Sequence, residues 1–255
     1  MLPLIVAAVG GLALYKFLTK KSDEKPPQRQ RLSDPAIVVL GRTGAGKSTL
    51  INWLTNSDQL AVGDVASTTR EIATVKATVD GRSILFVDTP GIGEVSTHTG
   101  YRDQLLSWCS SHHEDIRLCL MLLQADAKAH VEELDLLNRM AAVMPGLQTR
   151  IVLSQVDKMK PVRKSLPGST WEDAITAGGL KVDHIREKIN LTASQFDCPR
   201  EHVLPISSIE AFNKGTIVSH VMDILLRQHC FSAADICSSC GCSRSAIAAH
   251  SWECR

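Results

Sequence analysis

Residues 36–48 read AIVVLGRTGAGKS. The first five residues are continuously apolar and mostly β-branched, which predicts a short buried strand over Ala36–Leu40. The next eight fit the pattern G-x-x-x-x-G-K-[ST], and Lys47–Asn56 has the periodicity of a helix. A glycine-rich turn between a strand and a helix predicts that residues 41–48 form a loop that binds phosphate groups, called the phosphate-binding loop below. A chance match is disfavoured because both flanking elements are present.

The residues of this loop have the backbone freedom and the charge that phosphate binding requires. Glycines let the backbone N–H groups curl inward, and the helix N-terminus adds partial positive charge. We expect Lys47 to reach the β- and γ-phosphates of a nucleotide and Ser48 to ligate Mg²⁺. The predicted contacts comprise Gly41, Arg42, Thr43, Gly44, Ala45, Gly46, Lys47, Ser48 and Thr49.

A second motif follows in the segment Ile84–Gly91. An apolar strand ends in Asp88, and Gly91 comes three residues later. Asp88 is placed to hold Mg²⁺, usually through water, and the amide of Gly91 to meet the γ-phosphate and report its loss. The alternative is a plain strand that ends in the turn at Pro90-Gly91, which the preceding phosphate-binding loop makes the weaker reading.

The remaining chain alternates strands and helices. Strands over Glu71–Val79 and Ser83–Val87 are joined by Asp80-Gly81, a strong two-residue hairpin signal. Further strands are expected at Leu118–Leu123, Arg150–Leu153 and His202–Ile206, and helices at Val131–Val143, near Val182–Leu191, and at Ile209–Arg227. This order predicts an α/β fold with a mostly parallel sheet, one antiparallel edge strand and helices on both faces.

These motifs, together with Ser67-Thr68-Thr69-Arg70, resemble the Era-like branch of the translation-factor-related P-loop GTPases. The resemblance covers roughly residues 34–228 and implies a Ras-like GTPase domain that binds GTP or GDP with Mg²⁺. It implies that Thr69, with Thr68 beside it, closes over Mg²⁺ and the γ-phosphate. Metal ligands are then Ser48, Thr69 and Asp88, and the catalytic set is Lys47, Thr69 and Gly91.

The segment Ser154-Gln155-Val156-Asp157 stands where that family carries [NT]-K-x-D. Asp157 is suited to accept two hydrogen bonds from guanine, whereas adenine offers no matching pair; the alternative is an aspartate that only caps a loop. Gln155 replaces a lysine that braces the phosphate-binding loop, which predicts weaker nucleotide affinity. Ser207-Ser208 resembles the last guanine-contacting motif of the family.

Two other departures concern hydrolysis. Ile92 stands where Ras-type proteins carry the glutamine that orients water, and Gly44 stands where potassium-activated relatives carry asparagine. Glu94 and His98 lie in the same loop as Ile92, but neither is assigned a role. Intrinsic hydrolysis is therefore expected to be slow, well below about 1 per second.

The chain ends differ from the body. Residues 1–20 carry an apolar run close to the lower limit for crossing a bilayer, roughly 17 residues; no basic residue precedes it, and Lys16, Lys20, Lys21 and Lys25 follow. We expect a single-pass anchor that leaves the following domain in the cytoplasm; the alternatives are a helix on the membrane or on the protein, and a cytoplasmic chain. Residues 21–34 read as a polar linker, 35–228 as the GTPase domain and 229–255 as a cysteine-rich tail.

The cysteines divide into two groups. Cys109, Cys119 and Cys198 are scattered through the body and are expected to be free thiols without a disulfide framework. The tail carries Cys237, Cys240, Cys242, His250 and Cys254. Their spacing leaves open a Zn²⁺ site, against a plain cysteine-rich tail.

The sequence thus favours a membrane-associated switch that hydrolyses GTP to GDP and phosphate. An ATP-hydrolysing subunit and a non-catalytic GTP-binding scaffold remain alternatives. The net charge of +1 does not indicate nucleic acid as a partner. A homodimer through the GTPase domain and a protein effector stay open, and Met159–Pro199 is expected to form a lid or a partner surface.

Overall fold

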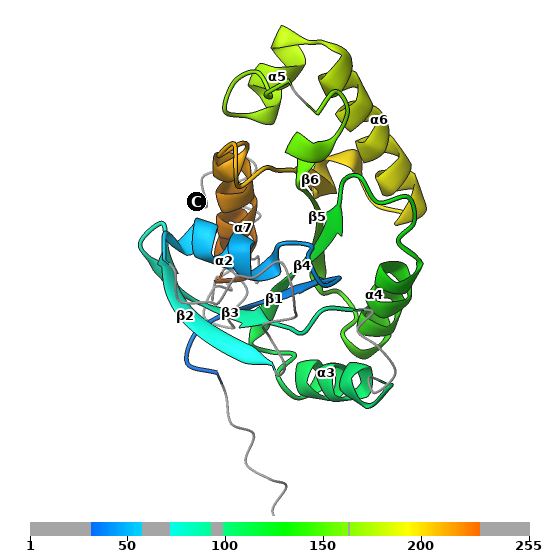
Figure 1. Ribbon diagram of the computed structural model, residues 1–255. Helices are drawn as coiled ribbons and strands as arrows, with labels where there is room; N and C mark the ends of the chain where they lie inside the picture. The colour runs from blue at the N-terminus through cyan, green and yellow to red at the C-terminus, as the bar shows by residue number, and fades with distance from the viewer. Residues whose placement is uncertain (1–31, 58–71, 93–98, 163, 230–255) are drawn as a thin grey trace, which may run out of the picture. The chain divides into compact units, whose positions relative to one another are not determined.

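The computed structural model describes residues 32–57, 72–92, 99–162 and 164–229. These residues build a sheet whose strands lie in the order β2-β3-β1-β4-β5-β6 (Figure 1). The strands are β1 (Ala36–Gly41), β2 (Ala73–Val79), β3 (Arg82–Asp88), β4 (Ile116–Gln124), β5 (Gln148–Ser154) and β6 (Val203–Pro205). Only the pairing of β2 with β3 is antiparallel among these strands. The predicted mostly parallel sheet with one antiparallel edge strand is confirmed.

Helices cover both faces of the sheet. They are α2 (Lys47–Thr55), α3 (Thr99–Ser111), α4 (Val131–Val143), α5 (Trp171–Ala177), α6 (Leu180–Gln195) and α7 (Lys214–His229), with short 3-10 turns η1 (Val156–Lys158) and η2 (Arg200–His202). Figure 1 shows α2 and α7 on one face and α3, α4 and α6 on the other.

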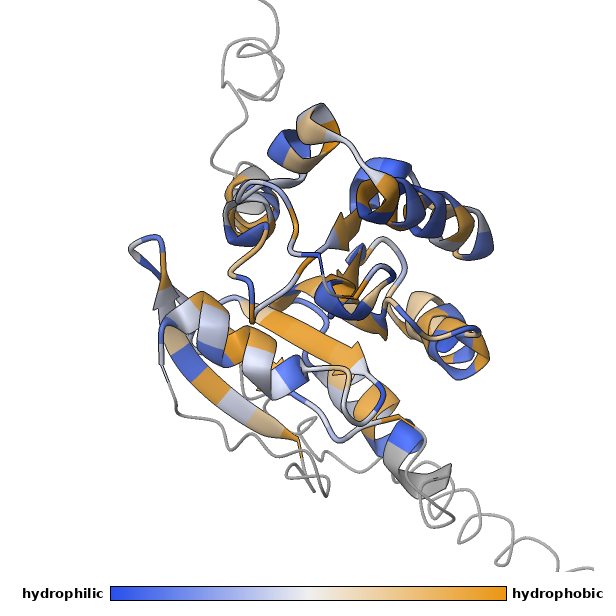
Figure 2. Ribbon diagram, turned by 45° about the horizontal axis from the view of Figure 1, so that its top comes forward, coloured by the Kyte–Doolittle hydropathy of each residue, from blue (hydrophilic) through white to orange (hydrophobic). Residues whose placement is uncertain are grey.

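Strand β1 lies between two apolar layers. Alternate residues point to opposite faces of a strand, so Val38 and Leu40 join the layer under α3, α4 and α6, whereas Ile37 and Val39 join the layer under α2 and α7. All four side chains are fully buried. The central strands accordingly appear as an apolar slab between amphipathic helices in Figure 2. Burial on both faces explains why the sequence shows a continuous apolar run here rather than an alternating one.

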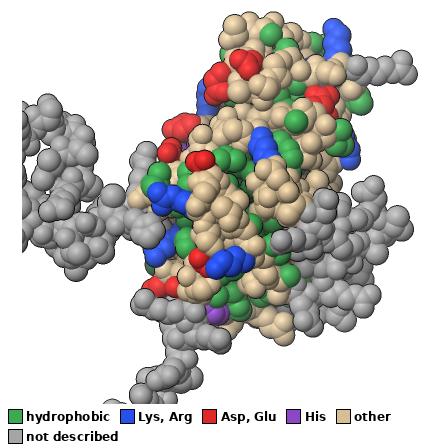
Figure 3. Space-filling model, turned by 90° about the vertical axis from the view of Figure 1, so that its left-hand side faces the viewer, with side chains coloured by type: hydrophobic (Ala, Val, Ile, Leu, Met, Phe, Trp, Pro, Cys, Tyr) green, Lys and Arg blue, Asp and Glu red, His purple; other side chains and the backbone are tan. Residues whose placement is uncertain are grey.

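The surface carries charge of both signs. On the face that Figure 3 shows, acidic and basic side chains are interspersed with apolar and uncharged ones. This mixture agrees with the net charge of +1.

The hairpin between β2 and β3 forms where it is predicted. Asp80 has φ 49° and Gly81 has φ 74°, so both turn residues are left-handed. This conformation is the one that a tight two-residue hairpin requires and that Asp-Gly favours.

The last helix begins later than predicted, at Lys214 rather than Ile209. The backbone at Ala211 (φ 50°) and Asn213 (φ 66°) is left-handed and cannot continue a helix. Phe212 instead pairs its backbone with Ser207, with its N–H 2.8 Å from the Ser207 carbonyl oxygen. The prediction from sequence missed this turn.

Within the segment Met159–Pro199, helix α6 contributes to the core, whereas most of the other described residues are half-buried or exposed. Val182, Ile185 and Ile189 of α6 are buried in the same apolar layer as β1 and α4. The inner face of α6 therefore covers the sheet, and the expectation of a lid or partner surface for this segment stays a prediction.

The structure describes three cysteines, all of them free thiols: Cys109, Cys119 and Cys198. Burial raises the pKa of Cys109 to about 12, and burial also raises the pKa of Cys119. In the described part of the chain no helix is long and apolar enough to cross a membrane, and no three metal-binding side chains cluster. The predicted anchor (1–20) and the tail cysteines with their Zn²⁺ option lie outside the described residues.

Asn213 fixes the turn before α7. Its buried amide nitrogen donates to the Pro205 carbonyl oxygen at 2.9 Å. Its amide oxygen accepts from the Trp171 N–H at 3.2 Å and from the Thr216 hydroxyl at 2.6 Å. One side chain thus joins β6, α5 and α7.

Replacing Asn213 by alanine should lower the free energy of unfolding by about 2–4 kcal/mol, because buried partners lose their hydrogen bonds. Urea denaturation measures it. Asn213→Gly should lose less than Asn213→Ala, since glycine tolerates positive φ. The matched change of exposed Asn138 on α4 should stay within about 0.5 kcal/mol of the parent; a comparable loss there would contradict the assignment.

Candidate functional site

The phosphate-binding loop joins β1 to α2 as predicted. Gly44 (φ 76°) and Gly46 (φ 91°) are left-handed, which lets the loop curl back toward the helix N-terminus. A Cβ atom on Gly41 would lie 2.6 Å from the carbonyl oxygen of Leu122 in β4, so only glycine fits at the loop's first position. The Leu50 N–H donates to the Gly46 carbonyl at 2.7 Å and starts α2.

Protein donors hold the carbonyl groups of this loop. The Lys47 ammonium lies 3.1 Å from the Gly41 carbonyl oxygen and 3.2 Å from that of Arg42. The Ser154 hydroxyl donates to the Ala45 carbonyl at 2.8 Å. These bonds fix the orientation of the loop's peptide units, and a fixed glycine-rich loop at a helix N-terminus is suited to bind an anion.

The predicted metal ligands Ser48 and Asp88 are in contact. The Ser48 hydroxyl donates to Oδ2 of Asp88 at 2.8 Å, and Asp88 is fully buried at the end of β3. Next to it, the Thr89 hydroxyl donates to the Val39 carbonyl at 2.8 Å and ties this segment to β1. A hydroxyl and a carboxylate at this spacing are the oxygen donors that Mg²⁺ prefers, so the residues fit the ion.

Gly91 lies directly against the phosphate-binding loop. A Cβ atom on Gly91 would lie 2.6 Å from the Cα atom of Thr43. The N–H of Ile92 donates to the Gly41 carbonyl at 3.1 Å, and the Ile92 side chain is buried in the core. A glycine is therefore required at position 91, where the sequence predicts contact with the γ-phosphate.

The residues predicted to read the base form a second group. The buried Ser207 hydroxyl donates to Oδ1 of Asp157 at 2.7 Å, which orients the carboxylate. The Lys181 ammonium donates to the main-chain oxygens of Asp157 (2.8 Å) and Lys164 (2.7 Å), which holds the loop that carries Asp157. Ser208 is half-buried beside Ser207.

Gln155 contacts the phosphate-binding loop despite the absence of lysine at its position. Its amide nitrogen donates to the Gly44 carbonyl oxygen at 2.7 Å. The amide nitrogen of Gln124, at the end of β4, donates to the same oxygen at 3.0 Å. A brace on the loop is therefore present, although the charge of a lysine is not.

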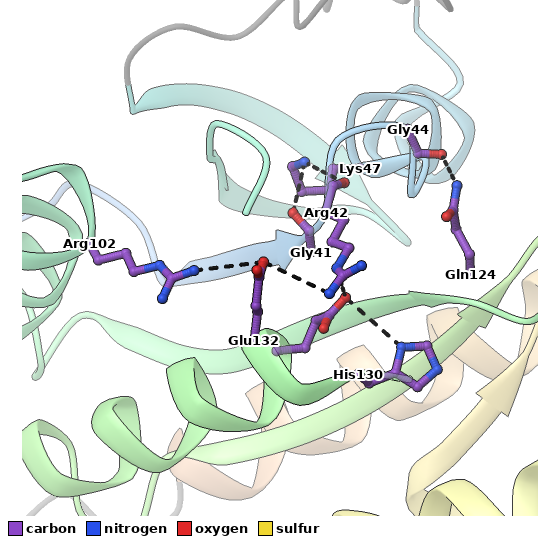
Figure 4. Close-up of polar contacts among 9 residues, drawn as sticks. Gly41, Arg42, Gly44, Lys47, Arg102, Gln124, His130 and Glu132 are labelled. Carbon is purple, nitrogen blue, oxygen red and sulfur yellow. Dashed lines mark hydrogen bonds and ion pairs between the residues drawn. The ribbon is translucent and has the colours of Figure 1, made fainter. Parts of the chain in front are cut away.

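The side chain of Arg42 leaves the loop toward α4 (Figure 4). Its Nε lies 2.9 Å from Oε1 of the buried Glu133, and its Nη2 lies 3.8 Å from Oε2 of Glu132. Arg102 of α3 reaches the same oxygen of Glu132 at 3.7 Å. Burial opposes ionisation of Glu133, but the neighbouring His130, the helix-start N–H and Arg42 together lower the pKa of its carboxyl. The nucleotide contact predicted for Arg42 stays a prediction for its backbone.

The two groups lie at one edge of the sheet. Gly41, Asp88, Gln124, Ser154 and Pro205 end β1, β3, β4, β5 and β6, and the carboxyl ends of parallel strands meet at the same edge. The predicted Thr68 and Thr69 lie outside the described residues, as do Glu94 and His98.

Sequence reasoning missed Gln124 and Glu133, and it named Ser154 in a motif without giving this residue a role. A polar residue at the carboxyl end of a buried parallel strand is the signal that marks Gln124 and Ser154. The sequence signal for Glu133 is weaker, because acidic residues are common in the first turn of any helix.

Comparisons with known proteins agree with this geometry. Residues 36–154 match the model of a family described as 50S ribosome-binding GTPase. The structure is similar to that of a probable GTP-binding protein, EngB (TM-score 0.53, 17% identity, covering 75% of this chain and 99% of that chain).

Two further solved structures are similar. Era, in complex with MgGDPNP and a segment of 16S ribosomal RNA, gives a TM-score of 0.56 at 18% identity over 74% of this chain and 56% of its own. The structure of Toc33 from Arabidopsis thaliana gives a TM-score of 0.55 at 14% identity, covering 88% of this chain and 93% of that chain. At these identities the likeness establishes the fold.

The chain has the fold of a Ras-like P-loop GTPase domain. In this domain the phosphate-binding loop, the segment 88–92 and the Asp157–Ser207 pair occupy the edge at which α/β proteins bind ligands.

Replacing Glu133 by glutamine should lower the free energy of unfolding at pH 7 by about 1–3 kcal/mol, because the Arg42 charge loses its buried partner. The folded pKa of Glu133 lies below its ordinary value of 4.5, so its stabilisation is present above that pH and is lost as pH falls. The difference between parent and variant should therefore shrink below about pH 4.5.

Urea denaturation between pH 3 and 7 gives this difference directly. Asp135→Asn is the matched control on α4: Asp135 pairs with Arg139 at 3.0 Å and with Arg102 at 3.8 Å, and its side chain is 45% exposed, so its loss should cost about 0–1 kcal/mol. An equal decrease in the free energy of unfolding for both variants would show that the buried Glu133 carboxylate does not stabilise Arg42.

Proposed function

We propose that this protein binds GTP and GDP with Mg²⁺, hydrolyses GTP to GDP and phosphate, and acts as a molecular switch. One observation carries the proposal. At a single sheet edge the Lys47 loop, the Ser48–Asp88 contact of 2.8 Å and the Asp157–Ser207 contact of 2.7 Å stand together. Phosphate, Mg²⁺ and base each require one of these three groups.

The phosphate end needs charge stabilisation above all. Lys47 and the loop N–H groups face the β- and γ-phosphates, while Ser48, Asp88 and the predicted Thr69 hold Mg²⁺, which neutralises developing charge on the phosphates. Gly91, pressed against Thr43, is placed to register the γ-phosphate. Era with MgGDPNP and Toc33 with Mg²⁺ and GMPPNP are solved examples of this fold with such ligands.

The base end supports a choice of guanine over adenine. The Asp157 carboxylate is held by the Ser207 hydroxyl at one oxygen, which pre-orients it to accept from the guanine ring N–H and amino group. Adenine would leave this carboxylate without donors and is rejected for that reason.

Hydrolysis should be slow without an activating partner. Ile92 is buried in the core and has no group that orients water. Turnover well below about 1 per second follows for a domain of this fold that works alone. This feature also keeps the non-catalytic GTP-binding scaffold as the second candidate.

The setting of the switch rests on sequence alone. We propose that residues 1–20 anchor the chain in a membrane with the GTPase domain in the cytoplasm, and that Zn²⁺ in the tail remains an option. One similar structure is a dimerization-deficient mutant of Toc33, so a homodimer through this domain is a further option.

Binding and phosphate release test the proposal on the full chain in mild detergent. GTP, GDP and ATP are titrated with Mg²⁺, and phosphate is followed over hours, with Lys47→Ala as the inactive reference. Tight binding of GTP and GDP together with slow release of phosphate supports the proposal. Preference for ATP would overturn it, and guanine binding without any release, even with membranes present, would favour the scaffold.

Asp157→Asn should weaken GTP binding by at least about 100-fold, because the carboxylate that accepts both guanine donors is lost. The same variant should gain affinity for xanthosine triphosphate, whose extra ring oxygen suits an amide donor. Asp183→Asn is the control: Asp183 is exposed on α6 and pairs only with Arg186 among the described residues. Unchanged GTP selectivity in Asp157→Asn would remove Asp157 from the base site.

A further inference from the structure

Two glutamine side chains, one at the end of β4 and one just after β5, converge on one backbone oxygen. Gln155 Nε2 lies 2.7 Å and Gln124 Nε2 lies 3.0 Å from the carbonyl oxygen of Gly44, at the tip of the phosphate-binding loop. Gln124 stands 80 residues and Gln155 111 residues from Gly44 in the chain. A carbonyl oxygen has two lone pairs, so both bonds can form together.

The surroundings show that this contact is built into the fold. Gln124 ends β4, and Gln155 follows β5 in a left-handed conformation (φ 59°) that is unusual for a residue other than glycine. Gly44 is itself left-handed (φ 76°), and the next carbonyl, that of Ala45, receives the Ser154 hydroxyl. The ends of β4 and β5 therefore hold two successive peptide units of the loop.

We propose that Gln124 and Gln155 form an uncharged two-amide clamp on Gly44 that sets the lifetime of bound nucleotide. The inference rests on the function proposed above. Both are positioning residues: they fix the Gly44–Ala45 peptide units, and with them the N–H groups that face the phosphates. The clamp supplies geometry without adding positive charge, so its contribution to nucleotide binding does not depend on ionic strength.

The rate at which labelled GDP dissociates from the full chain tests the clamp. Methionine matches glutamine in length but has no N–H donor. Gln124→Met and Gln155→Met should each speed dissociation only about two- to threefold, because the other amide still holds the oxygen. The double variant should speed it by more than the product of the single effects, about tenfold or more, because no amide then holds the Gly44 peptide unit in place.

Ionic strength separates the clamp from a charge effect. The effect of Gln155→Met should be the same at low and high salt. Gln155→Lys keeps a donor and adds a charge near the phosphates, so it should slow dissociation at low salt, and the slowing should fade as salt rises. Gln155→Lys behaving like Gln155→Met would overturn the inference.

Gln148→Met is the matched control, at the opposite end of β5 and exposed, and it should dissociate GDP like the parent. Thermal unfolding of each variant confirms that it is folded. Two outcomes would contradict the clamp while the proposed function stands, provided that the parent binds GDP. In the first, the single and double variants release GDP at the rate of the parent. In the second, the rate increase in the double variant equals the product of the two single increases. If the parent binds no guanine nucleotide, the proposed function itself fails.

Discussion

The satisfied carbonyl groups of the phosphate-binding loop are the constraint on which the rest of the site depends. A loop that turns its N–H groups to an anion must place its carbonyl oxygens elsewhere, and a buried carbonyl without a donor costs about 1–3 kcal/mol. Lys47 and Ser154 supply such donors to the buried carbonyls of Gly41 and Ala45, and Gln124 and Gln155 hold the exposed carbonyl of Gly44. Gly41 adds a steric condition, since any side chain there would meet β4.

The donors come from distant parts of the chain because a parallel sheet gathers strand ends. The strands β1, β3, β4 and β5 run in the same direction, so their last residues share one edge. A turn after β1 can therefore be held by residues 80–111 positions away. The same arrangement brings Asp88 to Ser48 and places Asp157 beside the loop that follows β6.

Local rules account for what the sequence could predict. Strand β1, the loop and α2 follow from one apolar run and one glycine pattern, and the β2–β3 hairpin follows from Asp80-Gly81. The start of α7 could not be read in this way, because the left-handed turn at Asn213 is stabilised by Pro205, Trp171 and Thr216 rather than by its neighbours in sequence. Local patterns also gave no means to pair Gln124 or Gln155 with Gly44. Because Gln155 stands where relatives carry lysine, the sequence suggested that the contact bracing the phosphate-binding loop is lost. In the structure the Gln155 amide is long enough to donate to a carbonyl oxygen of that loop, that of Gly44.

The charge balance around the loop explains why an uncharged brace matters. Arg42 brings a full positive charge to the loop, but Glu132 and Glu133 pair with it behind the loop, away from Lys47. The attraction for phosphate then rests on Lys47, on the N-terminus of α2 and on aligned backbone N–H groups. The N–H groups act only when their peptide units are held in place, since a mobile dipole must be ordered at a cost in entropy. In the proposed nucleotide site, rigidity of the loop therefore adds affinity alongside charge, and residues at the ends of β4 and β5 supply hydrogen bonds that hold the loop.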